Sequence, residues 1–483
     1  MNIKELKDRF VKFRLVLYST FVFYADAIMN LLDALSGNQS ATSVVELSLN
    51  PLFDRTYSSL PRAIGGWFDS QASESVIGEQ LDSEEQRQSL IASMVPPPQA
   101  RPFWLFATDV TPQPRQFADT LADRSVVHAP NAVLSNKPIS IGHQYSVVVA
   151  LPEKETSPSP PWVIPLSVER VASEQSALEV GSEQLHQLLE QPHSPFEQQL
   201  CVHVGDTSYS AVEYLASGKG KPDLVQIARL RGNRVLYSPA PSKKDRPSAG
   251  HPTWYGERFA LKDSSTWSEP EEIVSTSLTS RKGKTYQVEI QAWDQLLMRG
   301  KKGIPMHQFA LKLIRVQLFR SNGQPFYQRP LWLIVAGERR HELSLIEIWD
   351  AYRQRYDIEH FFRFGKQKLL MDKYQTPEVE HEENWWQLVS LAYLQLWLAA
   401  PLAQNMPRPW ETEEPIDSTT RLSPTRVQRD FQRIIQQMGT PAQPPKPRGY
   451  SPGRRKGDSQ KTRKKQKVVF KGKKQAPLEK KIA

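Results

Sequence analysis

Four regularly spaced polar residues lie near residue 350 and could together act on a phosphodiester. They are Tyr352, Arg355, Glu359 and Lys366. At roughly 100° per residue, a helix would place all four within an arc of about 60°. A carboxylate can hold a divalent metal ion, whereas a phenol and two cations can hold phosphate groups. The spacing therefore favours phosphodiester chemistry on one face of a helix.

The same segment, residues 349–370, has a second face that is apolar. A separate arc of roughly 100°, wide enough to pack on a core, carries Ile358, Phe361, Phe362 and Leu369. The pattern predicts a helix that is anchored by this face. A solvated outer face with a few salt bridges explains the polar residues equally well, because charged side chains normally occupy the exposed side of a helix.

Two aspartates follow apolar runs that are typical of buried strands. Asp109 follows F-W-L-F-A-T, and Asp206 follows C-V-H-V-G. Side chains at the carboxyl ends of strands lie at the sheet edge where open α/β folds place their chemistry. Each aspartate alone is more often a turn former or a helix cap than a ligand. Together with Glu359 they could bind two Mg²⁺ ions, which prefer oxygen ligands and support in-line displacement at phosphorus.

The composition is that of a folded protein without a membrane segment. The chain has 483 residues, 39% of them hydrophobic, a length typical of two to three domains. A single cysteine, Cys201, excludes an intramolecular disulfide and a cysteine-based zinc cluster. The first residues lack a signal-peptide pattern, and no apolar run reaches the length of a membrane span. We therefore expect an intracellular protein.

The net charge of +10 comes entirely from the end of the chain. Residues 441–483 hold 15 Lys and Arg against two acids, so the remainder has 47 basic and 50 acidic residues. The tail is too polar and too rich in Pro and Gly to fold by itself. Such a segment binds polyanions without sequence choice, and nucleic acid is the usual partner, although a purely solubilising tail is an alternative. Any DNA-binding surface on the body must be a local patch.

The spacing Y-x2-R-x3-E-x6-K resembles the motif around the last acidic residue in DDE transposases of the IS-four group of bacterial insertion sequences. All four of its positions are matched near residue 350. Two further landmarks occur in order, D-V-T at Asp109 and G-D-T-S-Y at Asp206. The 152 residues between Asp206 and Glu359 match the large β-strand insertion of that group. The resemblance covers roughly residues 100–400; it is weak for the N-terminal helices and absent for the basic tail.

The resemblance implies an α/β fold with an RNase H-like core. Residues 101–215 and 341–404 would form this core, and residues 216–340 would form a β-rich insertion. Residues 1–95, whose pattern predicts mostly helix, would be a region with a possible role in DNA end binding. Residues 405–483 would be a Pro-rich and then basic disordered tail.

The same resemblance assigns roles to individual residues. Asp109, Asp206 and Glu359 would be the catalytic residues and the ligands of two Mg²⁺ or Mn²⁺ ions. The tyrosine, arginine and lysine of the motif would bind DNA phosphates near the scissile bond. Trp332 matches a tryptophan that can stack on a flipped base, although a tryptophan within an apolar strand is equally consistent with a core position. The basic run 229–234 could contact the DNA backbone or form a solvated sheet edge.

The function implied is that of a DNA transposase. It would cut double-stranded DNA at the terminal repeats of an insertion sequence and join the freed 3′-hydroxyl to target DNA. A homodimer on paired ends is expected, in the cytoplasm of a bacterium and associated with the nucleoid. Two alternatives are a catalytically inactive or domesticated DNA-binding derivative and an RNase H-type structure-specific nuclease. The presence of all three carboxylates argues against the inactive form.

Overall fold

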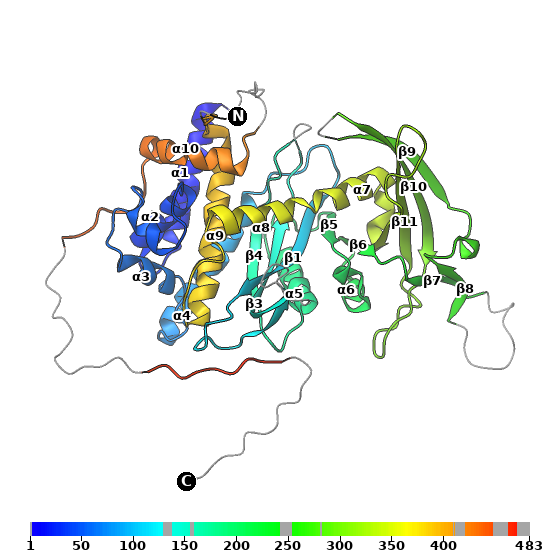
Figure 1. Cartoon of the computed structure of the whole chain (residues 1–483), viewed down its shortest axis with the longest axis horizontal. Coiled ribbons are helices and arrows are strands. Elements are labelled where there is room, and N and C mark those ends of the chain that lie inside the picture. Colours follow the sequence, from blue (N-terminus) through cyan, green and yellow to red (C-terminus); the bar gives the residue numbers. More distant parts are fainter. Residues whose placement is uncertain are drawn as a thin grey trace, which may run out of the picture.

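The protein is a mixed α/β molecule built on one large sheet (Figure 1). The computed structural model describes residues 2–128, 138–154, 159–241, 254–280, 283–408, 410, 421–447 and 462–470. Most of the basic run between residues 448 and 483, which the sequence predicts to be a disordered tail, lies outside these residues. Among the described helices, none combines the length and the apolar character that crossing a membrane requires.

Within the described residues, the main sheet has ten strands in the order β2-β3-β1-β5-β6-β12-β11-β10-β9, with β4 paired to β3. A separate two-stranded sheet joins β7 and β8. The strands are β1 (Trp104–Pro114), β2 (Ser125–His128), β3 (Ile139–Ala150), β4 (Ile164–Val171), β5 (Cys201–Gly205), β6 (Leu224–Leu230), β7 (Val235–Pro239), β8 (Tyr255–Ala260), β9 (Glu272–Thr279), β10 (Thr285–Leu296), β11 (Leu311–Phe319) and β12 (Leu331–Ala336).

The directions of the strands divide the sheet into two parts. β1, β5 and β6 run parallel to one another, whereas β3 lies antiparallel to β1, and β4 antiparallel to β3. β12 pairs antiparallel with β6 and continues through β11, β10 and β9. The β-rich segment therefore extends the central sheet instead of forming a sheet of its own, apart from β7 and β8.

The helices lie mainly at one end of the sheet and along its face (Figure 1). They are α1 (Ile3–Ser19), α2 (Ala25–Ser36), α3 (Ser59–Gly65), α4 (Glu74–Ser93), α5 (Ala177–Glu190), α6 (Val212–Ser217), α7 (Leu345–Gln354), α8 (Asp357–Lys368), α9 (Val379–Ala399) and α10 (Pro424–Met438). The N-terminal helices pack on α9, where the buried Arg14 pairs with Asp33 and donates a hydrogen bond to Gln395. One hydrophobic core joins these helices to the strands.

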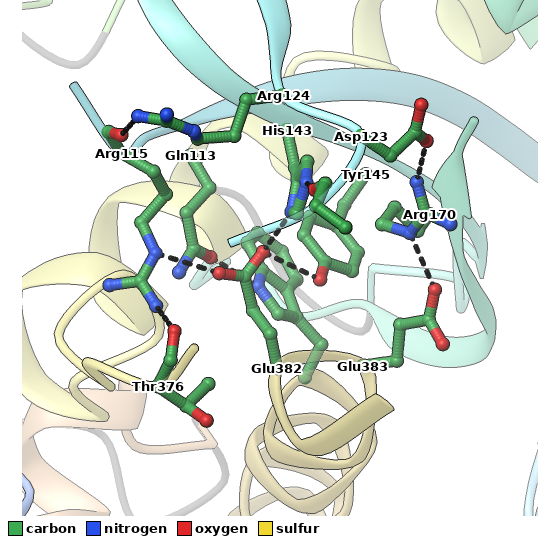
Figure 2. A network of polar contacts seen from close by, with 12 residues as sticks. Gln113, Arg115, Asp123, Arg124, His143, Tyr145, Arg170, Thr376, Glu382 and Glu383 are labelled. Atoms are coloured by element: carbon green, nitrogen blue, oxygen red, sulfur yellow. Dashed lines mark hydrogen bonds and ion pairs between the residues drawn. The ribbon is translucent and has the colours of Figure 1, made fainter. Parts of the chain in front are cut away.

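Helix α9 is held to the sheet by a buried polar network (Figure 2). The Glu382 carboxylate is fully buried and forms an ion pair with Arg115, which follows β1, at 2.8 Å. It also accepts a hydrogen bond from the Tyr145 hydroxyl at 2.9 Å and lies 2.7 Å from the Nδ1 atom of His143, both on β3. The Tyr145 ring stacks on Trp386 with centroids 4.2 Å apart. The network thus fixes the strands of the candidate site against α9.

Helix α10 contradicts the prediction that the chain is disordered from residue 405 onward. Residues 424–438 form an amphipathic helix whose apolar side chains recur at helical spacing, as Val427, Phe431, Ile434 and Ile435 do. All four are buried against the helical end of the core. The expectation was wrong for this segment, because the neighbouring Pro-rich composition masked one apolar helical stripe.

Phe431→Ala is expected to lower the free energy of unfolding by about 3–5 kcal/mol. The ring is fully buried and packs edge-on against Phe10, so its removal leaves a cavity between α10 and α1. Urea denaturation followed by circular dichroism measures the change. Phe117→Ala, at a ring that is 90% exposed, is the matched control and should change stability by less than about 0.5 kcal/mol. Equal midpoints for the two variants would exclude α10 from the core.

Candidate active site

Asp109 and Asp206 are brought to the same level by two parallel strands. In the last paired position of β1 and β5, Ala107 lies opposite Val204. Asp109 and Asp206 each come two residues later, so the register places them beside each other. β5 ends one residue before Asp206, and β1 therefore has no β5 neighbour from this point. The two carboxylates stand where the sheet opens.

The sequence predicts that Asp109 stands at the end of its strand, and the structure contradicts this. Asp109 lies in the middle of β1, which continues to Pro114. The reason is β3, whose residues from Gly142 to Ala150 pair with β1 along most of its length and hydrogen-bond the part beyond Asp109. A strand end cannot be located from an apolar run when a distant antiparallel strand supplies the next hydrogen bonds.

The turn that carries Asp206 is shaped by close packing. A side chain at Gly205 would place its Cβ atom 2.4 Å from the Cβ atom of Tyr209, so only glycine fits there. The Ser208 backbone N–H donates to the Asp206 Oδ1 atom at 2.7 Å and holds the carboxylate in the turn. Tyr209 is buried beneath. Sequence reasoning assigned it no role, although the G-D-T-S-Y motif contains it.

Glu359 lies on a helix that is divided, whereas the sequence predicts one continuous helix over residues 349–370. Helix α7 ends at Gln354 and α8 begins at Asp357. Tight i to i+3 hydrogen bonds bridge the division, and the Ile358 N–H donates to the Arg355 carbonyl at 3.2 Å. Because the backbone stays close to helical across the division, Arg355 and Glu359 still share one face.

Arg355 stands between two of the candidate carboxylates. Its Nη1 atom lies 3.5 Å from the Asp109 Oδ2 atom, and its Nη2 atom lies 3.8 Å from the Glu359 Oε1 atom. The Nη1 atom is buried and has no hydrogen-bond partner among the described residues. Arg355 thus balances charge on strand β1 and helix α8 together, at distances that leave the carboxylate oxygens available to other ligands.

The electrostatics of Asp109 connect all three carboxylates. The pKa of Asp109 is raised to about 6, mainly because the carboxyl group is buried. The positive charge of Arg355 and the hydrogen bond from the Val110 N–H partly offset this rise. Glu359 and Asp206 both raise that pKa further, because each brings negative charge close to Asp109. The charges of Asp206 and Glu359 therefore reach Asp109, although Glu359 follows it by 250 positions along the chain.

The carboxylates fit a divalent metal ion by their chemistry. They are oxygen donors of the kind that Mg²⁺ takes, and their combined charge is opposed by Arg355 without a hydrogen bond to either carboxylate. As they stand, no group of three His, Cys, Asp or Glu side chains among the described residues is close enough to enclose a metal ion. Binding a metal ion between them would therefore require these side chains to come closer together.

Tyr352 lies beside Arg355, and Lys366 contacts the part of β1 that follows Asp109. The Arg355 guanidinium is 6.0 Å from the centre of the Tyr352 ring. Burial raises the pKa of Tyr352, and the charges of Arg355 and Arg229 oppose this shift. The Lys366 Nζ atom donates to the Thr111 hydroxyl at 2.6 Å and to the Pro112 carbonyl at 3.2 Å, both on β1. Burial also lowers the pKa of Lys366.

Trp332 lies inside an aromatic cluster and not on an open surface. It is 3% exposed and packs edge-on against Trp267 with centroids 5.2 Å apart, and near Trp293 at 5.9 Å. One edge of Trp332 borders a basic pocket next to the site. At 3% exposure the ring offers little surface on which a base could stack, so the structure favours the core position over base stacking.

A comparison with known protein families relates most of the chain to one of them. Residues 17–299, more than half of the chain, match the family model of the DDE superfamily endonucleases. The chain belongs to that family. The matched part of this DDE superfamily endonuclease contains Asp109 and Asp206, whereas Glu359 lies beyond it. None of the curated proteins matches the chain.

Membership of the family has two consequences for this DDE superfamily endonuclease. The substrate of the protein is DNA, and members of the family generally use divalent metal ions. The carboxylate chemistry described above is compatible with such ions. The finer relationship to the IS-four group and its motif rests on the four residues near position 350 and stays a prediction.

His203, on β5 beside the site, is expected to make this endonuclease sensitive to acid. Its ring is fully buried and lies 2.9 Å from the Thr108 hydroxyl. Burial lowers its pKa from 6.5 to about 3. Between these values only the unfolded chain binds the proton, so stability is complete above pH 6.5 and is lost as the pH falls. The loss is at most about 1.4 kcal/mol per pH unit.

Urea unfolding at pH 7.5, 6.0 and 5.0 measures this effect. His203→Gln retains a polar partner for Thr108 but does not titrate, so its free energy of unfolding should fall less steeply below pH 6.5 than that of the natural protein. Identical slopes for both proteins would show that His203 does not determine the acid sensitivity.

Proposed function

We propose that this DDE superfamily endonuclease is a transposase of the IS-four group. It would cleave double-stranded DNA at the terminal repeats of an insertion sequence and transfer the freed strand into target DNA. The observation that carries the proposal is the position of Arg355, whose guanidinium lies within 4 Å of both Asp109 and Glu359. This contact unites the first and last residues of the expected triad, and Asp206 is level with Asp109 in the register.

Asp109, Asp206 and Glu359 would be the catalytic residues and would hold two Mg²⁺ or Mn²⁺ ions. Bound there, such ions supply a nucleophile at neutral pH and neutralise charge on the phosphate and the leaving oxygen. Tyr352, Arg355 and Lys366 would hold the phosphates that flank the scissile bond. Arg355 can exchange its long contacts with carboxylates for charge-assisted hydrogen bonds to a phosphate.

The topology supports the same proposal. The strands β4-β3-β1-β5-β6 have one antiparallel half and one parallel half, which we interpret as an RNase H-like core of residues 101–215 and 341–404. Residues 216–340 would be its insertion, and residues 1–95 would contribute to DNA end binding. A homodimer on paired ends, in the bacterial cytoplasm at the nucleoid, belongs to this proposal.

A strand-transfer assay tests the proposal. The full chain is incubated with Mg²⁺ or Mn²⁺, a supercoiled plasmid and a labelled duplex that carries a pre-cut end of the inverted repeat flanking the gene. A transposase joins the label covalently to the plasmid. A nuclease of RNase H type would cut without joining, and an inactive derivative would bind the labelled end without either reaction. Absence of a joined product together with cleavage would replace the proposal by the nuclease.

A further inference from the structure

A pocket of about 820 Å³ opens beside the candidate active site, between the turn after β6, the loop after β8 and the start of β12. Its charged lining residues are all basic: Arg229, Arg231, Lys262 and Arg329. The lining also includes apolar side chains such as Leu230 and Leu261. Such a gathering of like charges is unfavourable by itself, because each cation raises the energy of its neighbours.

The four cations lack acidic partners. None of them forms an ion pair within 4.0 Å with any carboxylate of the described ranges, whereas Arg315, which lies opposite Trp332 in the register of β11 and β12, pairs with Glu289. Bulk charge does not explain the cluster, because the chain before residue 441 has more acidic than basic residues. A solvated sheet edge would be expected to mix charges of both signs. A pocket whose lining includes basic side chains and no carboxylates instead favours the binding of an anion from outside the protein.

The pocket is continuous with the candidate active site. Thr207, which follows Asp206 directly, lines it. Arg229, which also lines the pocket, is close enough to Tyr352 for its charge to oppose the rise in the tyrosine pKa that burial causes. A polyanion bound across Tyr352 and Asp206 would therefore meet Arg229 first and the other three cations next.

We infer that this pocket binds the phosphate backbone of a DNA strand that leaves the active site past Asp206. The inference rests on the proposed function, because it takes the carboxylates as the place of cleavage. Contacts of this kind are independent of sequence and add to affinity mainly through release of counterions. They orient the strand, while Asp109, Asp206 and Glu359 remain the catalytic residues.

The salt dependence of DNA binding tests the inference. The double variant Arg231→Gln/Arg329→Gln is compared with Arg258→Gln/Arg320→Gln, which removes two exposed arginines of the same β-rich segment that do not line the pocket. Both pairs are made in an Asp109→Asn background, and fluorescence anisotropy of a labelled 40-base-pair duplex is recorded between 50 and 200 mM salt. Each lost phosphate contact lowers the slope of log K against log salt by about 0.9.

The pocket variant is expected to reduce this slope by about 1.8, and the control variant to leave it unchanged. An unchanged slope for the pocket variant, or an equal reduction in both, would overturn the inference. Cleavage by the protein with its natural Asp109 is measured separately. Cleavage with an unchanged slope refutes the pocket alone, whereas a reduced slope without cleavage refutes the proposed function and leaves the pocket as a DNA-binding site.

Discussion

Asp109→Asn is expected to reduce DNA cleavage by at least about 10³-fold, with DNA binding retained. The substitution preserves the shape of the side chain and removes its charge. The carboxylate that is level with Asp206 and contacts Arg355 is then lost as an anionic oxygen ligand. Nicking of a labelled duplex in Mg²⁺ or Mn²⁺ measures the rate, and anisotropy without metal measures the binding.

Retention of binding follows from the position of Asp109. It is a carboxylate in a site that must accept phosphates, so its neutralisation weakens repulsion of the DNA and leaves the cations of the site in place. A variant that lost binding as well would indicate a folding defect, and its thermal unfolding would reveal this. Glu359→Gln and Asp206→Asn should give losses of similar size. Combining two of these substitutions should add little, because residues that act as one unit are not additive.

The matched control for activity is Asp350→Asn on α7. Asp350 is exposed and pairs with Arg353 at 2.8 Å, on the same helical segment but away from the carboxylates. This variant should cleave at the natural rate. If Asp109→Asn retained a tenth or more of the activity, or if Asp350→Asn lost as much, the assignment of the catalytic carboxylates would be wrong.

Glu382→Ala is expected to lower the free energy of unfolding by about 3–5 kcal/mol. Glu382 is the only carboxylate that Arg115 contacts among the described residues, and both side chains are buried (Figure 2). Its loss leaves the Arg115 guanidinium without a counter-charge and removes the acceptor of the Tyr145 hydroxyl. Desolvated groups without partners cost more than the original pair contributed. Urea denaturation at pH 7.5 measures the difference.

A double substitution distinguishes the contribution of the Arg115–Glu382 ion pair from the cost of leaving one buried charge unpaired. Arg115→Met together with Glu382→Leu removes both charges and retains much of the volume, so it should destabilise the protein less than Glu382→Ala alone. Asp350→Ala breaks the exposed pair with Arg353 and should change stability by no more than about 1 kcal/mol. A loss below 1 kcal/mol for Glu382→Ala would show that the network does not hold α9 to the sheet.

The sequence by itself determined the features that depend on neighbouring residues. Apolar runs predicted the β1 and β5 segments, and the spacing near residue 350 predicted a helix with Glu359 and Arg355 on one face. Helical periodicity acts over three or four residues, and a buried strand over five or six, so each is visible in a short window. The family match then related the chain as a whole to the cleavage of DNA.

Only the tertiary structure decided the features that depend on distant partners. β1 continues past Asp109 because β3 pairs with it, and the β-rich segment joins the main sheet because β12 pairs with β6. Pairing of this kind is set by packing across many residues, which no local pattern records. Burial of Trp332 and the Glu382 network belong to the same class.

The candidate site shows both contributions at one place. Its residue types and their order along the chain were readable from the sequence, since oxygen ligands and phosphate-binding cations have few substitutes. The 3.5 Å contact between Arg355 and Asp109 was not readable. It depends on how α8 lies across β1, and that orientation follows from the packing of the whole core.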